Sequence, residues 1–164
     1  MGFGTATSTR NEKPQRVEMS NIIDFSCGGY HVVALSKEGD LYCWGHNGQG
    51  QLGSGDVKSR SFPTKVDFCF PAKIVKISCG RNHSMVILSD GSLFCWGDNS
   101  YGQLGVGNVE VGCLNVPTQV KEIESQIIQV KCGYAHSMAI TSRNELFSWG
   151  GNRYGQLGNG KESV

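Results

Sequence analysis

The sequence has no excess of charge of either sign, and this argues against one class of function at the outset. Its 164 residues contain 15 lysines and arginines against 14 aspartates and glutamates. It contains no basic tract or stripe, which is the pattern expected of a protein that binds nucleic acid phosphates. We therefore expect no direct binding to nucleic acid and no attachment to a charged membrane surface.

Long apolar segments are also missing. The sequence contains no run of about 18 apolar residues, so we expect no helix that spans a bilayer. The first residues, from Met1 to Ala6, lack the basic start and the apolar centre of a secretory signal. The expected location is the cytoplasm, with the nucleus as the alternative.

The sequence does contain one pattern in three copies. Each copy has a Cys-Gly-x-x-His segment, and these segments begin at Cys27, Cys79 and Cys132. A Trp-Gly pair and then a Gly-Gln-Leu-Gly segment follow in every copy, with the tryptophans at Trp44, Trp96 and Trp149. The tryptophans lie 52 and then 53 positions apart. A fixed period of about fifty residues is typical of a solenoid, a propeller or an array.

The second copy predicts four β-strands. Pro63 opens the first of them at residues 63–66, because proline suits the start of an edge strand. Residues 74–79 alternate in polarity, and residues 84–88 form an apolar run that is typical of a strand buried on both faces. Asp90-Gly91 predicts a hairpin turn before the fourth strand at residues 93–96. Pro14 and Pro117 open the equivalent strands of the other copies, so the chain should have twelve strands.

Four short antiparallel strands in each unit of 40 to 50 residues indicate a propeller blade. We predict an all-β fold of three four-stranded antiparallel blades, with almost no helix because 23 glycines make helix costly. Met1 to Gly4 align with the Leu-Gly-x-Gly that ends each copy, so residues 1–12 are interpreted as the tail end of a preceding repeat. The repeats then span residues 13–61, 62–115 and 116–164. Closed propellers usually have about four to eight blades, so this one should be partial or open.

The order C-G-x-x-H, then W-G-x-N-x-x-G-Q-L-G, resembles the repeat of the regulator of chromosome condensation family. The resemblance covers essentially the whole chain and implies the blades of a propeller that has seven of them in this family. Members of the family range from a guanine-nucleotide exchanger to targeting domains of HECT-type ubiquitin ligases. The open ends of a partial propeller should favour self-association, because they expose strand edges and apolar faces.

The seven cysteines form an odd set and are not expected to make disulfides. Cys43 and Cys95 share a repeat position at which the third copy has Ser148, and a serine there would leave a disulfide partner unpaired. We interpret the cysteines as reduced, buried side chains within strands.

The repeated histidines, His31, His83 and His136, do not predict a metal centre. A zinc site needs three or four ligands that converge on one point, whereas these residues lie on separate blades. We interpret each as a buried histidine that bonds the backbone across the blade. Because no nucleophile, base or ligand set converges, we expect no enzymatic activity, no cofactor and no metal.

Residues 48–53 match the dinucleotide fingerprint G-x-G-x-x-G in form. That fingerprint needs a following helix whose N-terminus meets the pyrophosphate, and no helical period follows here. Ser100 and Arg153 replace the first glycine in the other copies. We therefore expect no nucleotide site, and we interpret the repeated tryptophans as blade-to-blade packing.

The residues between Cys-Gly and His vary among the copies, and they carry most of the functional information. The family resemblance implies that these turns lie on one face of the propeller, where partners dock. Tyrosine and arginine are favoured anchors of protein interfaces. The candidate partner-binding residues are Tyr30, Arg81, Asn82 and Tyr134; the alternative is that these turns are merely exposed.

Two functions remain open from the sequence. The first is a protein–protein interaction scaffold, a recruiting or targeting module whose partner is a small GTPase or a ubiquitination substrate. The second is a guanine-nucleotide exchange factor for a Ran-like GTPase, which needs no covalent chemistry because it acts by stabilising the nucleotide-free state. The family's exchanger has acidic residues in some of these turns. None of the three turns here contains an acid, which favours the scaffold.

Overall fold

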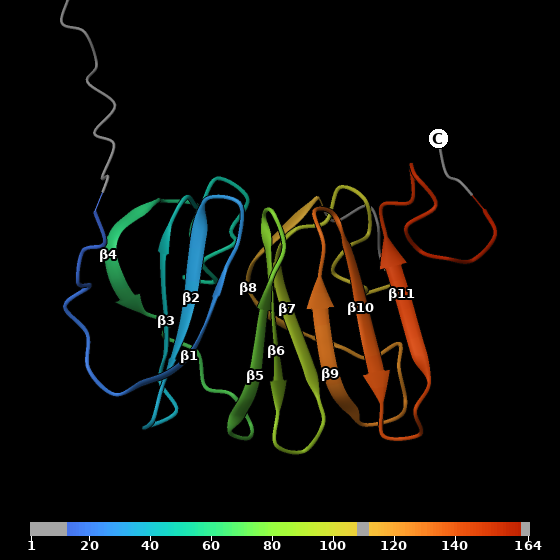
Figure 1. Cartoon of the computed structure of the whole chain (residues 1–164), viewed down its shortest axis with the longest axis horizontal. Coiled ribbons are helices and arrows are strands. Elements are labelled where there is room, and N and C mark those ends of the chain that lie inside the picture. Colours follow the sequence, from blue (N-terminus) through green and yellow to red (C-terminus); the bar gives the residue numbers. More distant parts are fainter. Residues whose placement is uncertain (1–12, 108–111, 162–164) are drawn as a thin grey trace, which may run out of the picture.

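The computed structural model describes residues 13–107 and 112–161 and shows an all-β chain (Figure 1). Residues 1–12, interpreted above as the end of a preceding repeat, lie outside the described part. No helix among the described residues could cross a bilayer. The strands are β1 (Ile22–Cys27), β2 (His31–Ser36), β3 (Leu41–Gly45), β4 (Arg60–Lys65), β5 (Ile74–Cys79), β6 (His83–Leu88), β7 (Leu93–Asp98), β8 (Cys113–Val120), β9 (Ile127–Cys132), β10 (His136–Thr141) and β11 (Leu146–Gly150).

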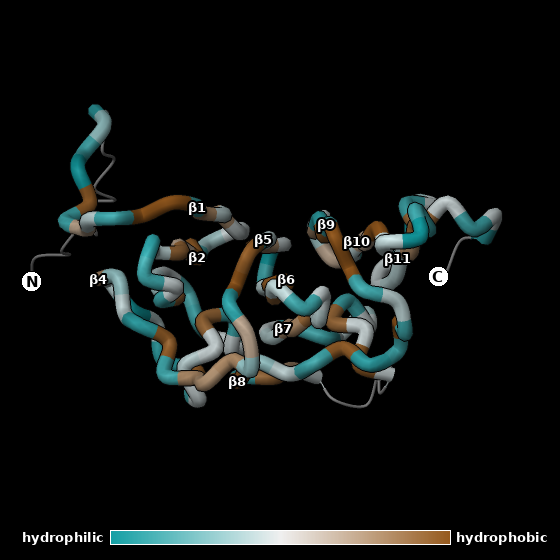
Figure 2. Tube along the Cα trace, turned by 90° about the horizontal axis from the view of Figure 1, so that it is seen from below, coloured by the Kyte–Doolittle hydropathy of each residue, from teal (hydrophilic) through white to brown (hydrophobic). Residues whose placement is uncertain are grey.

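These strands form three antiparallel sheets, which we call blades 1, 2 and 3. Blade 1 has the order β1-β2-β3-β4, blade 2 the order β5-β6-β7-β8, and blade 3 the order β9-β10-β11. The first strands of the blades, β1, β5 and β9, lie along one side of the row and contact one another in turn (Figure 2). The all-β prediction and the partial propeller are confirmed.

The fourth strand of each blade comes from the next sequence repeat. Pro63 lies in β4, which pairs with β3 of blade 1, and Pro117 lies in β8, which pairs with β7 of blade 2. The prediction that the proline strand opens its own blade is therefore wrong. The proline strand instead closes the outer edge of the preceding sheet, where a missing ladder donor costs nothing. Each sequence repeat thus links two blades covalently.

The described residues contain eleven strands instead of the twelve expected. Residues 14–17, the predicted strand at Pro14, are not in a strand, and blade 3 has three strands. In blades 1 and 2 the proline strand forms by pairing with the third strand of the preceding repeat. The described residues hold no such partner for residues 14–17, which explains the missing strand.

Apolar side chains fill the two interfaces between blades. In the first, Val33, Leu41 and Leu52 of blade 1 pack against blade 2, which contributes Ile77 and Trp96 among others. The second interface repeats this arrangement one blade further on, with Met85, Leu93 and Leu104 against Ile127 and Val130. The fully buried pattern of β6, at the centre of the row, agrees with the predicted apolar strand.

A repeated polar network joins the blades within this apolar packing. The Nε1 of Trp96 donates to the Gln51 carbonyl over 2.8 Å, and Ser84 Oγ donates to the same carbonyl over 2.9 Å. His31 Nε2 lies 2.9 Å from Ser84 Oγ and donates to it, because the serine proton is already engaged. His83, Ser137, Gln103 and Trp149 repeat these bonds between blades 2 and 3.

The structure corrects two side-chain predictions. His31 and His83 are buried as expected, but their cross-blade partner is a serine hydroxyl rather than the backbone. His136 was also expected to be buried, but it is only half-buried. All seven cysteines are free thiols, yet Cys27, Cys69 and Cys113 are exposed instead of buried. Cys27 lies on the side of blade 1 that no described blade covers, while the other two occupy positions outside the repeated pattern. Burial raises the pKa of the Cys79 thiol, which is enclosed between blades 1 and 2, to about 12.

Candidate functional site

The three Cys-Gly-x-x-His turns lie at the same end of their blades, at the upper edge in Figure 1. Together they form an open depression of about 560 Å³. Its lining comes from the equivalent residues of three blades: Cys27 to Tyr30, Cys79 to Arg81, and Cys132 to Tyr134. The candidate site is therefore built by the repeat itself, because each blade contributes one turn to it.

The glycine and the histidine that all three turns share have a structural role. The amide of Gly80 donates to the His83 carbonyl over 2.9 Å, and the turns at Gly28 and Gly133 are closed in the same way. A Cβ at Gly80 would overlap the His83 ring, so no larger residue fits beneath the imidazole. Burial lowers the pKa of His83 to about 4, so this ring is neutral at pH 7. Glycine and histidine thus fix the turn and leave the two residues between them free to vary.

Backbone bonds tie each turn to the next. The amide of Gly29 donates to the Arg81 carbonyl over 3.0 Å, and the amide of Arg81 donates to the Tyr134 carbonyl over 3.1 Å. The spacing between the variable side chains is therefore set by hydrogen bonds from blade to blade. A side chain placed on this face starts from a rigid base, which lowers the ordering cost of binding a partner.

Three of the four candidate residues, Tyr30, Arg81 and Tyr134, line this depression. Tyr30 is 70% exposed and Tyr134 is 62% exposed. The guanidinium carbon of Arg81 lies 4.6 Å from the centre of the Tyr134 ring, a cation–π distance. Asn82 differs, because it does not line the depression. Its Oδ1 accepts from Gln51 Nε2 over 3.4 Å, so its side chain contacts blade 1.

The glycine-rich loops that follow β3, β7 and β11 lie on the same face. The amide of His46 donates to the Tyr30 carbonyl over 2.7 Å, and Asp98 and Gly151 make the equivalent bonds one and two blades further on. We call the three turns, residues 28–30, 80–82 and 133–135, and the loop segments 46–50, 98–102 and 151–155 together the turn face.

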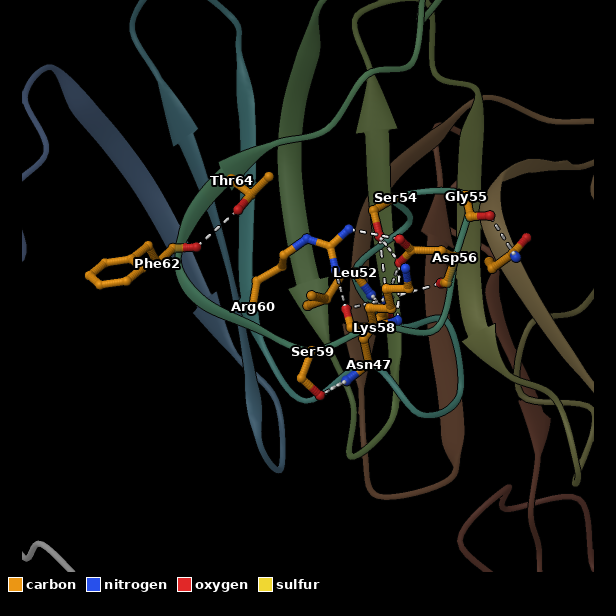
Figure 3. Close-up of polar contacts among 11 residues, drawn as sticks. Asn47, Leu52, Ser54, Gly55, Asp56, Lys58, Ser59, Arg60, Phe62 and Thr64 are labelled. Atoms are coloured by element: carbon orange, nitrogen blue, oxygen red, sulfur yellow. Dashed lines mark hydrogen bonds and ion pairs between the residues drawn. The ribbon is translucent and has the colours of Figure 1, made fainter.

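A buried asparagine organises each of these loops. Asn47 Oδ1 accepts from the Leu52 amide over 2.9 Å, and its Nδ2 donates to the Asp56 and Lys58 carbonyls (Figure 3). Asn99 and Asn152 accept from Leu104 and Leu157 in the same way. Sequence reasoning missed this role, although the asparagine of W-G-x-N recurs unchanged in all three copies. It holds the loop backbone and is not itself available to a partner.

Sequence reasoning also missed three exposed residues of the loops. Tyr101 is 65% exposed and Tyr154 is 80% exposed, and they share one repeat position. The guanidinium carbon of Arg153 lies 5.7 Å from the centre of the Tyr154 ring. With Tyr30 and Tyr134, these residues place four of the five tyrosines of the chain on the turn face. The available signal was the variation of these positions within an otherwise constant loop.

Among the described residues, the turn face includes neither a candidate metal centre nor a turn followed by a phosphate-binding helix. Within residues 13–107 and 112–161, no group of three histidine, cysteine or acidic side chains could hold a metal ion. The fingerprint-like residues 48–53 form a turn, and no helix follows them in that part of the chain. What the turn face offers is an exposed set of aromatic and cationic side chains on a rigid backbone.

Two four-stranded blades and one three-stranded blade, joined by equivalent tryptophan, serine and histidine contacts, define a β-propeller repeat protein. The model of the RCC1-like domain matches residues 1–164, and the chain belongs to that family. The predicted resemblance to the regulator of chromosome condensation repeat is confirmed.

Comparison with known proteins supports this assignment. The chain is 42% identical over 159 residues to the ultraviolet-B receptor UVR8 of Arabidopsis thaliana, covering 96% of this chain and 34% of the receptor. It is 38% identical over 160 residues to the probable E3 ubiquitin-protein ligase HERC6 of Homo sapiens, covering 94% of this chain and 16% of the ligase. The chain therefore spans about a third or less of the length of these relatives.

The fold is also similar to solved propellers. Prp20p from Saccharomyces cerevisiae, described with its binding to Gsp1p and histones, matches with a TM-score of 0.79 and 25% identity over 86% of this chain and 36% of Prp20p. Human WBSCR16 matches with a TM-score of 0.76 and 26% identity over 87% of this chain and 36% of that protein.

Proposed function

We propose that this chain is a protein-interaction scaffold, a recruiting or targeting module that binds a protein partner through the turn face. The observation that supports the proposal is the grouping of Tyr30, Arg81 and Tyr134 around one depression on a hydrogen-bonded backbone. A small GTPase or a ubiquitination substrate is the expected kind of partner. The chain itself is proposed to turn over no substrate and to act in the cytoplasm, with the nucleus as the alternative.

Matched variants test this proposal. Tyr30→Ala combined with Tyr134→Ala removes two exposed rings that lie outside the apolar packing between the blades, so folding should be retained. Arg143→Ala is the control, since Arg143 lies exposed in the β10–β11 hairpin at the opposite end of blade 3. Proteins that bind both the wild-type chain and the control, but not the double variant, are the expected result in quantitative affinity capture. Equal recovery by all three chains would contradict the proposal.

The second candidate function is guanine-nucleotide exchange on a Ran-like GTPase. It is favoured by the similarity to Prp20p, whose structure was described with its binding to Gsp1p. The only acid on the described turn face is Asp98, and it lies in a loop rather than in one of the three turns. A nucleotide-release assay on a Ran-like GTPase distinguishes the two functions, because acceleration by orders of magnitude would favour exchange.

We also propose that the chain self-associates through its two outer blade faces. Phe25 of blade 1 is 66% exposed, whereas its equivalents Ile77 and Val130 are buried between blades. Leu146 of blade 3 is 64% exposed, whereas its equivalents Leu41 and Leu93 are buried. The outer face of blade 1 and the outer face of blade 3 therefore carry the two sets of side chains that pack together wherever two blades meet within the chain.

A further inference from the structure

Two arginine–tyrosine pairs stand on the turn face, one on each side of blade 3. Arg81 lies over Tyr134 at the edge of the depression, and Arg153 lies over Tyr154 in the loop after β11. A guanidinium stacked on a ring keeps the N–H groups at its edge available, and that edge matches a carboxylate with two parallel hydrogen bonds. The rings also hold the two cations in place.

Neither guanidinium has an acidic partner within the described residues. The ion pairs found there are Arg60 with Asp56, and Lys65 with Asp40, and these lie beside β3 and β4. A surface arginine without a carboxylate gains little for the folded chain itself. Two of them, each with its guanidinium carbon over a tyrosine ring and both on the turn face, are suited to an external anion.

The turn face holds almost no negative charge that could compete. Asp98 is the single carboxylate of the turn face, all of whose residues the structure describes. Its Oδ1 already accepts bonds from the Ser100 hydroxyl over 2.6 Å and from the Ser100 amide over 3.0 Å. The local charge is therefore positive, although the chain as a whole is nearly neutral.

We infer that the turn face binds an acidic segment of a protein partner, with Arg81 and Arg153 receiving its carboxylates and the four tyrosines packing on its apolar side chains. The inference rests on the proposed function and specifies its partner. Nucleic acid fits less well, because two cations are far fewer than the roughly 6–10 phosphate contacts of a typical complex. Carboxylates spaced along a peptide need only the two guanidinium groups.

Peptide selection on the full chain tests the inference. Random displayed peptides of about sixteen residues, which span about 50 Å when extended, are selected on the wild-type protein. The expected result is a clear excess of Asp and Glu over the starting library. A selected peptide, made with a fluorescent label, is then titrated by anisotropy against the variants. A version with Asn and Gln in place of its acids should not bind.

The arginine variants give the quantitative result. Arg81→Ala and Arg153→Ala should each weaken binding of the labelled acidic peptide by about tenfold, the loss of one charge-assisted contact. Arg→Lys at either position should fall between, because lysine keeps the charge but lacks the two-pronged geometry. Arg143→Ala at the opposite end should bind like the wild type. Raising the salt concentration should weaken binding of the wild type more than that of the double Arg→Ala variant.

Three outcomes would overturn the inference. One is a set of selected peptides with no acidic excess. Another is a labelled single-stranded oligonucleotide that binds the wild type more tightly than the acidic peptide does. If the peptides are not acidic but still fail to bind Tyr30→Ala with Tyr134→Ala, the inference fails while the proposed function stands. The third outcome is a set of peptides that bind all variants equally, which would contradict both the inference and the proposed function.

Discussion

At the scale of single residues, one carbonyl accounts for much of the repeated motif. The Gln51 carbonyl accepts from Trp96 of the next blade and from Ser84, which in turn accepts from His31. Gly53 is needed beside it, because a Cβ there would lie 2.8 Å from the Trp96 Nε1. The Gly-Gln-Leu-Gly segment therefore forms the surface on which the tryptophan of the following blade packs.

Replacement of Trp96 tests this role. Trp96 is fully buried, so Trp96→Ala should lower the free energy of unfolding by about 3–5 kcal/mol. Trp44 has the same repeat position but is half-buried and has no polar partner in the described part of the chain, so Trp44→Ala should cost less. Tyr101→Ala, at an exposed loop position, should stay within about 0.5 kcal/mol. Urea unfolding measures all three, and equal midpoints for Trp96→Ala and Tyr101→Ala would contradict the packing role.

At the scale of elements, the turn and the edge strand of each repeat have separate roles. The turn between the first two strands of each blade presents the variable residues, while the proline strand closes the preceding sheet. Gly80 affects both the turn and the contact between blades. It lies in the turn, and it leaves room for the His83 ring, which bonds Ser137 of blade 3. A change at this one position should therefore disturb both the turn and the interface.

Substitution of glycine at two positions checks that argument. Gly80→Ala places a methyl group against the His83 ring and should destabilise the chain by about 1–3 kcal/mol, as overpacking usually does. Gly112→Ala is the matched control, because a Cβ at Gly112 meets nothing within 4 Å. Thermal unfolding followed by circular dichroism compares the two. A Gly80→Ala protein as stable as the control would show that the ring can move aside at no cost.

At the scale of the whole molecule, the row of blades has two unlike ends. Blade 1 presents the side that blades 2 and 3 bury, with Phe25 and Cys27 exposed on it. Blade 3 presents the other side, with Leu146 exposed. Because the two sides are complementary within the chain, association between chains should be head to tail, in the sense of a heterologous interface.

Light scattering at increasing concentration tests this association. The wild-type chain should show an average mass above its 17.8 kDa, rising with concentration. Phe25→Asp should bring the mass back toward that of a monomer, because it places a charge in the apolar contact. Phe62→Asp is the control, since Phe62 is 77% exposed on the outer strand β4 and lies outside the blade interfaces. A constant monomer mass for the wild type would refute the proposal.

Features set by residues close in sequence were predicted correctly, whereas contacts between distant residues were missed. The strands, the hairpin at Asp90-Gly91 and the burial of Trp96 follow from local pattern, because alternation and turn chemistry act over a few residues. The membership of β4 and β8 in the preceding blades was missed, because strand pairing depends on which edges meet in space. Asn82 illustrates the same limit, since its contact with Gln51 joins residues 31 positions apart.

The sequence by itself determined the repeat, the all-β class, the family and the turn that carries Tyr30, Arg81 and Tyr134, because each of these is encoded in residue types at fixed spacing. Only the tertiary structure decided which strand closes which blade, that the histidines bond serines, and that Tyr101, Arg153 and Tyr154 share a face with the turns. These features depend on contacts between residues one repeat apart. Such contacts form when the blades pack against each other, and no local pattern specifies them.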